Sequence, residues 1–206
     1  MALIHIEENK IYRYGIWQMD EDEETLIYLS GCKAPTHIAN SVRRTEYLSV
    51  RSLAKALGVD PEDIAYHSSG KPYLKNGDCN ISIAHTKKYV TVLLSKSLTT
   101  GIDIETRSEK VIRIKKKFML PEEEALIISS DIDQVTGLLL HWCAKEAMFK
   151  AIGETGVDFV NSFKITHFTP TGEKGSFKAI AIRNEKTFQV DYQIEKDFVL
   201  TCCFLI

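Results

Sequence analysis

The 206-residue chain lacks several features that mark whole classes of protein. It has five cysteines, an odd number, and none shows the paired spacing of a zinc ligand set. This pattern argues against a structural zinc site and favours a reducing cytoplasm over a disulfide-bonded secreted fold. The formal net charge is −2, so the chain as a whole has no basic surface of the kind that nucleic-acid binding needs.

Long hydrophobic runs are also missing. The longest apolar stretch, residues 198–206, is too short to span a bilayer and indicates a buried strand. Residues 1–8 have neither a basic region nor a long apolar core, so we expect no signal peptide. We therefore expect a cytoplasmic protein without a membrane partner.

What the chain does contain is an ordinary globular composition with 44% hydrophobic and 26% charged residues. Two segments have the caps and apolar periodicity of helices, residues 41–58 with Ser41 as the candidate cap and residues 134–152 before Gly153. Acidic residues 20–24 and Pro121 should each open a shorter helix. Alternating or apolar runs predict strands within residues 1–19 and at 80–86, 89–94, 101–105, 177–182, 188–194 and 198–205. The fold class is therefore α+β.

A faint internal repeat suggests how these elements are organised. Tyr47–Gly58 aligns with Trp142–Gly153 without a gap, and each segment precedes a β-rich stretch. The match predicts a pseudo-twofold monomer of two similar lobes, residues 1–98 and 99–206, each with a helix packed on an antiparallel sheet. Arg51 and Glu146 would then occupy equivalent positions, and the active site would lie in the cleft between the lobes.

The helix over 134–152 is apolar nearly all the way round except on one mixed face. At 100° per residue this face holds Trp142, Lys145, Glu146, Phe149 and Lys150. One interpretation is an ordinary Glu146–Lys150 pair at a solvent edge, which contributes little. The other is a buried charge cluster that a bound metal and an anion compensate.

The strand Gly101–Glu105 supplies a second acidic feature. Because side chains alternate along a strand, Asp103 and Glu105 share one face while Ile102 and Ile104 share the other. Two neighbouring carboxylates repel unless a cation lies between them, and Mg²⁺ suits one or two carboxylates with phosphates and waters. A solvent-facing edge strand is the alternative. The glycine before the pair indicates close backbone approach or a bend.

Basic residues and turn formers are scattered through the first half. Arg43, Arg44 and Arg51 lie on the helix over 41–58, where arginines usually form only a solvated face. The loop 68–73 contains Lys71, and His85 and Thr86 end a strand; each could contact phosphate or be merely structural. A basic cluster, Arg113–Lys117, is either a solvated face or a surface that steers an acidic partner.

Taken in order, these motifs resemble a known family. Gly101-Ile-Asp-Ile-Glu105, followed by Trp142-x-x-Lys-Glu-Ala-x-x-Lys150, resembles the signature of 4′-phosphopantetheinyl transferases. Gly70-Lys71-Pro72 is similar to the family's Gly-Lys-Pro loop. Residues 82–86 are similar to its Ser-His-Ser/Thr element, although Ala84 stands where the family often has serine. The length and apparent duplication resemble the larger, two-lobed, surfactin-synthetase-activating class.

The resemblance implies a reaction and a set of roles. The chain would transfer the 4′-phosphopantetheine arm of coenzyme A to a serine of an apo acyl or peptidyl carrier protein, an acidic partner, releasing adenosine 3′,5′-bisphosphate. Mg²⁺, or Mn²⁺, would be held by Asp103, Glu105 and Glu146. The catalytic residues would be Glu146, as base or as metal ligand only, and Lys150. The coenzyme A contacts would be Arg44 (or Arg43), Arg51, Lys71, Pro72, His85, Thr86, Lys145 and Lys150.

Two other functions use the same residues. A non-catalytic module that binds coenzyme A would keep the basic contacts but has no need of the complete acidic set. A metal-dependent phosphohydrolase would use the carboxylates to activate water, and it would turn over coenzyme A without any carrier protein.

Overall fold

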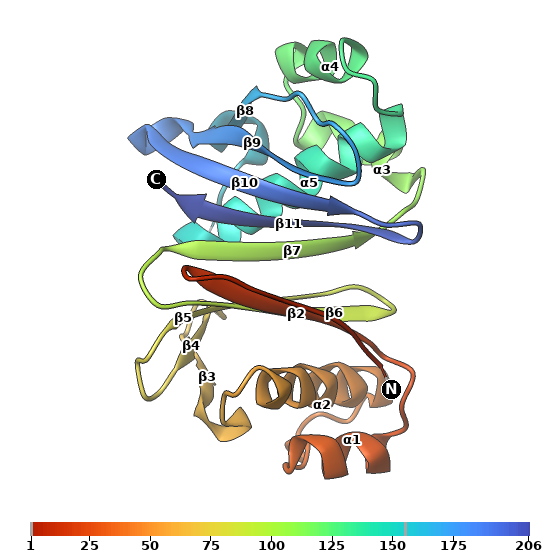
Figure 1. Cartoon of the computed structure of the whole chain (residues 1–206), viewed down its shortest axis with the longest axis vertical. Helices are drawn as coiled ribbons and strands as arrows, with labels where there is room; N and C mark the ends of the chain where they lie inside the picture. The colour runs from red at the N-terminus through yellow and green to blue at the C-terminus, as the bar shows by residue number, and fades with distance from the viewer. Residues whose placement is uncertain (1, 155) are drawn as a thin grey trace. The chain divides into compact units, whose positions relative to one another are not determined.

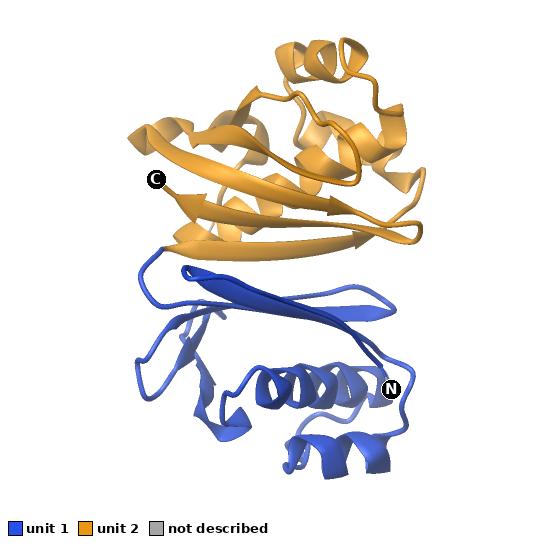
Figure 2. Cartoon of the chain, in the orientation of Figure 1, with its two compact units in different colours: residues 1–98 blue, residues 99–206 orange. Residues whose placement is uncertain are grey.

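The computed structural model describes residues 2–154 and 156–206. The chain divides into two compact units, residues 1–98 and residues 99–206, which Figure 2 colours separately. Each unit combines helices with an antiparallel sheet, so the predicted α+β class with two similar lobes is confirmed. The pseudo-twofold relation between the lobes, the cleft between them and the monomeric state stay predictions.

Unit 1 is built around a four-stranded antiparallel sheet with the strand order β1-β2-β6-β5. Helix α2 packs on β2 and β6 of this sheet, and α1 packs on α2 (Figure 1). A small hairpin, β3-β4, follows α2. The elements of this unit are β1 (Leu3–Glu8), β2 (Tyr12–Gln18), α1 (Glu23–Ser30), α2 (Ser41–Ala56), η1 (Pro61–Asp63), β3 (Ile64–Tyr66), β4 (Pro72–Leu74), β5 (Asn80–His85) and β6 (Tyr89–Ser95).

Local capping explains where the helices of unit 1 begin and end. Asn40, one residue before the predicted cap Ser41, is the N-cap of α2, and its side chain accepts a hydrogen bond from the Arg43 amide. The prediction of Ser41 was therefore wrong by one position, because an Asx side chain caps as well as a hydroxyl. Gly58 follows the helix with a φ of 76°, a left-handed conformation that glycine adopts without strain.

Unit 2 contains a five-stranded antiparallel sheet with the order β7-β11-β10-β9-β8. Helix α5 lies against this sheet and contacts β7 and β11 most extensively (Figure 1). The elements of this unit are β7 (Thr100–Thr106), α3 (Lys110–Ile114), η2 (Lys115–Lys117), α4 (Pro121–Ile128), α5 (Gln134–Ile152), α6 (Phe159–Ser162), β8 (Phe163–His167), β9 (Lys174–Ala181), η3 (Ile182–Asn184), β10 (Lys186–Ile194) and β11 (Phe198–Leu205).

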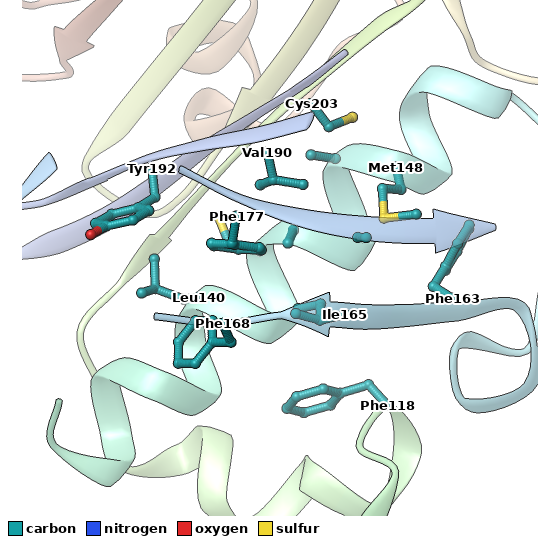
Figure 3. Close-up of a cluster of buried hydrophobic side chains, with 14 of the residues drawn as sticks. Phe118, Leu140, Met148, Phe163, Ile165, Phe168, Phe177, Val190, Tyr192 and Cys203 are labelled. Atoms are coloured by element: carbon teal, nitrogen blue, oxygen red, sulfur yellow. The ribbon is translucent and has the colours of Figure 1, made fainter. Parts of the chain in front are cut away.

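Helix α5 has the bounds that the sequence predicted. Asp133 caps its N-terminus by accepting a hydrogen bond from the Thr136 amide at 3.0 Å, and Gly153 ends it in the left-handed conformation. Figure 3 shows apolar side chains of α5, such as Leu140 and Met148, among those of the sheet. Burial of this face, rather than local propensity alone, holds the helix in place.

The two units share one strand-and-helix arrangement. In unit 1 the strand before the helices, β2, pairs with β6, which pairs with β5. In unit 2 the corresponding strand, β7, pairs with β11, which pairs with β10. β1 is added beyond β2, whereas β9 and β8 are added beyond β10. The predicted repeat therefore has a topological basis within each unit.

A glycine marks the point where each long helix crosses its strand. A Cβ on Gly101 of β7 would collide with the carbonyl oxygen of Ala147 in α5. A Cβ on Gly15 of β2 would lie 2.7 Å from the Leu53 side chain of α2. The close backbone approach predicted at Gly101 is confirmed. It fixes how near α5 comes to Asp103 and Glu105, which lie further along the same strand.

None of the helices in the described part of the chain is long and apolar enough to cross a bilayer.

Candidate active site

The carboxylates of β7 face helix α5. Gly101 contacts α5, and the alternation along β7 puts Asp103 and Glu105 on the same side of the strand. The Lys150 ammonium donates to Asp103 Oδ1 at 2.6 Å, and the Trp142 indole N–H donates to Glu105 Oε1 at 2.8 Å. The strand and the helix motifs therefore meet in one site of unit 2.

Glu146 completes this acidic site from α5, one turn before Lys150. Burial, together with the Asp103 charge, raises the pKa of Glu146 and of Glu105 to about 7. Burial alone would lower the pKa of Lys150, but the Asp103 carboxylate raises it above its usual value. Three acids and one lysine thus share a half-buried space in which negative charge exceeds positive charge.

The donor chemistry of this site fits a hard divalent cation. Asp103 Oδ2 is buried and has no hydrogen-bond partner within the described residues, so its lone pairs remain available to a donor or a cation. Carboxylate oxygens are what Mg²⁺ and Mn²⁺ prefer, and Mg²⁺ commonly completes its shell with water and phosphate. Within residues 2–154 and 156–206, no three His, Cys, Asp or Glu side chains are arranged so that they could hold a metal ion by themselves.

Unit 1 contains a separate cavity of about 830 Å³ beside helix α2. The cavity is lined by four features that the sequence marked as basic or phosphate-binding: Arg43, Arg51, His85 and the Gly70/Pro72 turn. The lining residues that sequence reasoning did not assign are His37, Ile38, Ala39, Asn40, Glu46, Tyr47, Val50, Tyr66 and Ile83.

Arg51 is the most buried charged residue that lines this cavity. The residue is only 4% exposed, and its guanidinium lies 3.4 Å from the centre of the Tyr47 ring. The guanidinium donates one long hydrogen bond, 3.5 Å, to the Tyr47 carbonyl oxygen. No carboxylate of the described chain lies within ion-pair distance of Arg51. A buried cation without a counter-charge favours binding of an anion.

His85 lies in the same cavity opposite an acid. Its Nδ1 is 3.6 Å from Glu46 Oε1, so a protonated His85 would neutralise that carboxylate. Lys71 and Thr86 do not line the cavity themselves but are the immediate neighbours of Pro72 and His85, which do.

The structure distinguishes between the two arginines that the sequence left open. Arg43 lines the cavity. Arg44 instead donates to both carboxylate oxygens of Glu23 at 3.0 Å and to the Ala39 carbonyl at 2.8 Å. Arg44 therefore joins α1 to α2, and its guanidinium is already occupied.

Lys145, predicted on the mixed face of α5 as a phosphate contact, lies elsewhere. Its ammonium is fully buried, 2.7 Å from Glu123 Oε2, and also donates to the Phe118 carbonyl. Glu123 in turn accepts from the Ile165 and Leu120 amides. This placement leaves Lys145 unavailable to phosphate and makes it a structural bond between α5, α4 and β8.

Comparison with known proteins bears on the same residues. The sequence profile of the 4′-phosphopantetheinyl transferase superfamily matches residues 99–203, which include the whole acidic site. A 4′-phosphopantetheinyl transferase of Bacillus subtilis is 33% identical over 105 residues, which are 49% of this chain and 46% of that protein. The 4′-phosphopantetheinyl transferase gsp of Aneurinibacillus migulanus is 27% identical over 166 residues, which are 78% of this chain and 66% of that protein. The matches thus span less than two thirds of either relative's length. The profile covers just over half of the chain, and on this basis the chain belongs to the 4′-phosphopantetheinyl transferase superfamily.

Proposed function

We propose that this protein transfers the 4′-phosphopantetheine arm of coenzyme A to a serine of an apo carrier protein. The observation that carries the proposal is the pair of opposite charges: an unpaired buried Arg51 in unit 1, and the acids with Lys150 in unit 2. Coenzyme A has phosphates at its nucleotide end and a pyrophosphate that must be neutralised before attack. Family membership supports the same reaction.

The cavity of unit 1 is the proposed site for the nucleotide end. Arg51 and Arg43 would hold phosphate through their planar guanidinium forks, which suit bidentate contacts. His85 would add a donor, and the Gly70–Pro72 turn would bring Lys71 close to the ligand. Tyr47 and Tyr66 offer aromatic surface for a base in the same cavity.

Asp103, Glu105 and Glu146 are the proposed holders of Mg²⁺ or Mn²⁺. When bound there, the metal would neutralise pyrophosphate charge and polarise the phosphorus centre as a Lewis acid. Trp142 keeps Glu105 in place through its indole N–H, and Lys150 keeps Asp103 in place through its ammonium. Positions set in this way cost no reorganisation during the reaction.

The transfer itself requires a base and a cation from the chain. The serine Oγ forms a bond to the β-phosphorus, and the bond from that phosphorus to the bridging oxygen breaks, releasing adenosine 3′,5′-bisphosphate. Glu146 is our candidate to accept the serine proton, directly or through a water; the alternative is that it serves only as a ligand. Lys150 lies one turn away and would stabilise charge on the phosphoryl oxygens.

The basic segment over α3 and η2 is the proposed docking surface for the acidic carrier. Arg113, Lys116 and Lys117 are exposed there, and Ile112 is an exposed apolar residue among them. Lys115 is held by Glu124 at 2.6 Å. Phe118, at the end of the segment, packs on Trp142 with ring centres 5.1 Å apart, so this surface adjoins the acidic site within unit 2. None of the five cysteines forms a disulfide bond, which suits the reducing cytoplasm where we place the reaction.

Intact-mass spectrometry tests the proposed function. The full chain is incubated with Mg²⁺, coenzyme A and a panel of apo carrier proteins, with Asp103→Asn as the inactive reference. We expect one carrier serine to gain the mass of a phosphopantetheine arm with the wild-type chain only. Binding of coenzyme A without any mass gain would favour the non-catalytic module. Breakdown of coenzyme A in the absence of a carrier would favour the phosphohydrolase.

A further inference from the structure

Behind Asp103 lies a threonine that no motif marks. Thr201 of β11 is the direct cross-strand partner of Asp103 in β7. Directly opposed side chains lie on the same face of a sheet with their Cβ atoms about 5 Å apart. Both residues are buried, Thr201 completely. The hydroxyl and the carboxylate are therefore enclosed together beneath α5.

Each residue of this pair has one buried oxygen atom that lacks a hydrogen-bond partner among the described residues. Lys150 occupies Asp103 Oδ1, whereas Asp103 Oδ2 and Thr201 Oγ1 are both buried without a hydrogen-bond partner in the described residues. A buried polar group left unsatisfied costs about 1–3 kcal/mol. A hydroxyl donates one proton, and an ionised carboxylate can only accept, so the two orphans are chemically complementary.

Cys143 of α5 closes the third side of this space. Its sulfur is 3.9 Å from the Val199 carbonyl oxygen. The thiol lies close enough to Thr201 and to Asp103 to interact with both side chains. A thiol is a weak donor, so the strong donor available to Asp103 Oδ2 on this side is the Thr201 hydroxyl.

We propose that Thr201 is a positioning residue that donates to Asp103 Oδ2 and so fixes the orientation of this carboxylate toward Lys150 and a bound metal. Because the two residues are cross-strand neighbours, a change of side-chain torsion alone can join them. Hydrogen bonds to a ligating carboxylate commonly strengthen metal binding about 10–100-fold. The inference rests on the metal-binding role of Asp103 in the proposed function.

The test is Mn²⁺ binding to the full chain with coenzyme A present, followed by electron paramagnetic resonance. Thr201→Val keeps the side-chain shape but removes the hydroxyl, while Thr201→Ser keeps the hydroxyl. We expect Thr201→Val to raise the Kd for Mn²⁺ about tenfold and Thr201→Ser to stay within about twofold of wild type. Cys143→Ala should bind Mn²⁺ as wild type does. The melting temperature of Thr201→Val should fall, because the buried Asp103 Oδ2 loses its donor.

Three outcomes would overturn the inference in distinguishable ways. Wild-type Mn²⁺ binding by Thr201→Val, with binding lost in Asp103→Asn, would remove the role of Thr201 and leave the metal site standing. Wild-type Mn²⁺ binding by Asp103→Asn itself would remove the metal assignment together with the inference. An equal loss in Thr201→Val and Thr201→Ser would show that packing, rather than the hydroxyl, matters at this position.

Discussion

The two units use one arrangement of strand and helix for opposite charges. Both long helices end at a left-handed glycine, Gly58 in unit 1 and Gly153 in unit 2, and both cross a strand at a glycine. At the repeat position one unit has Arg51 and the other Glu146. The shared frame therefore sets where a side chain is placed, and the residue at that place decides whether the unit attracts an anion or a cation.

The two units each contain a buried cation, Lys145 and Arg51, and these two residues differ in their partners. Lys145 of unit 2 is fully buried with a carboxylate, two amides and a carbonyl arranged around the pair. Arg51 of unit 1 is almost as buried, but among the described residues its partners are only the Tyr47 ring and the Tyr47 carbonyl, at the end of a long hydrogen bond. A compensated buried pair is costly to break, whereas an uncompensated buried charge is available for a ligand. Burial alone therefore does not distinguish these two roles, whereas the hydrogen-bond and ion-pair partners of each cation do.

The largest expected effect comes from removing the Asp103 charge from the acidic site of unit 2. Asp103→Asn removes the charge to which Lys150 is bound and a proposed metal ligand. We expect transfer to a carrier to fall about a thousandfold, the rate equivalent of several kcal/mol of lost charge stabilisation. Single-turnover mass spectrometry measures the rate, and the exposed Glu109→Gln is the matched control. A near-normal rate in Asp103→Asn would refute the metal assignment.

Lys145→Met should have the next largest effect, on folding rather than on binding. Because Glu123 would be left buried without its partner, we expect the free energy of unfolding in urea to fall by about 3–5 kcal/mol. Lys164→Met, which breaks an exposed pair with Glu122, should leave that free energy almost unchanged. The double variant Lys145→Met/Glu123→Gln should recover part of the loss. Unchanged stability in Lys145→Met would contradict the structural role.

Arg51→Met is the counterpart in unit 1, with the opposite pattern. We expect affinity for adenosine 3′,5′-bisphosphate to fall about 10–100-fold, since a hydrogen bond to a charged group contributes about 1.5–3 kcal/mol. The melting temperature should be unchanged or higher, because no partner charge is left behind. Arg51→Lys keeps the charge without the fork and should be intermediate. Calorimetry measures the affinity, and a wild-type value for Arg51→Met would exclude this cavity as the nucleotide site.

The core of unit 2 should respond to acid through His141. Burial lowers the pKa of His141 from 6.5 to about 3, and its Nδ1 bonds the Gly137 carbonyl in the neutral form. The unfolded chain binds this proton below about pH 6.5 while the folded chain does not, so stability falls as the pH drops from about 6.5 toward 3.

His141→Leu should remove this dependence. Between about pH 7.5 and pH 5, we expect the free energy of unfolding of His141→Leu to fall by about 2 kcal/mol less than that of wild type. The exposed His67→Gln should keep the wild-type slope. Parallel urea titrations at the two pH values give the comparison, and equal slopes for His141→Leu and wild type would contradict the assignment.

The smallest expected effect is at the proposed docking surface of unit 2. Lys116→Glu/Lys117→Glu should raise the KM for the carrier about tenfold, since electrostatic steering changes association by at least this factor, and leave the KM for coenzyme A unchanged. Lys178→Glu/Lys186→Glu changes the same charge on exposed positions of β9 and β10 and is the control. Equal effects of the two double variants would assign the change to overall charge rather than to docking.

The features that local rules decide were predictable from the sequence. Helix α5 has its predicted bounds because Asp133 and Gly153 are local cap signals. Asp103 and Glu105 share a face because strands have a period of two. The choice between Arg43 and Arg44 stayed open, because neighbouring helix positions differ by 100° and the packing of α1 decides which one is free to line the cavity.

The features that depend on packing were not predictable. Lys145 shares a helix face with Lys150 by periodicity, but its partner Glu123 lies 22 residues earlier, in a helix whose docking on α5 no local signal gives. The cavity of unit 1 brings together His37, Tyr66 and His85 from three separate segments. The sequence did hold one signal for the contact between Tyr47 and Arg51, because this arginine follows the aromatic residue by four positions on one helix. Thr201 could be found only from the register of β11 on β7.

The most direct test of the division between the units is calorimetric titration of coenzyme A, with and without Mg²⁺, into wild type, Arg51→Met and Asp103→Asn. We predict that Arg51→Met weakens binding under both conditions. We also predict that Asp103→Asn loses only the gain in affinity that Mg²⁺ gives the wild type. If the two variants lose affinity in the same way regardless of Mg²⁺, the opposite charges of the two units do not serve separate ends of one coenzyme A molecule.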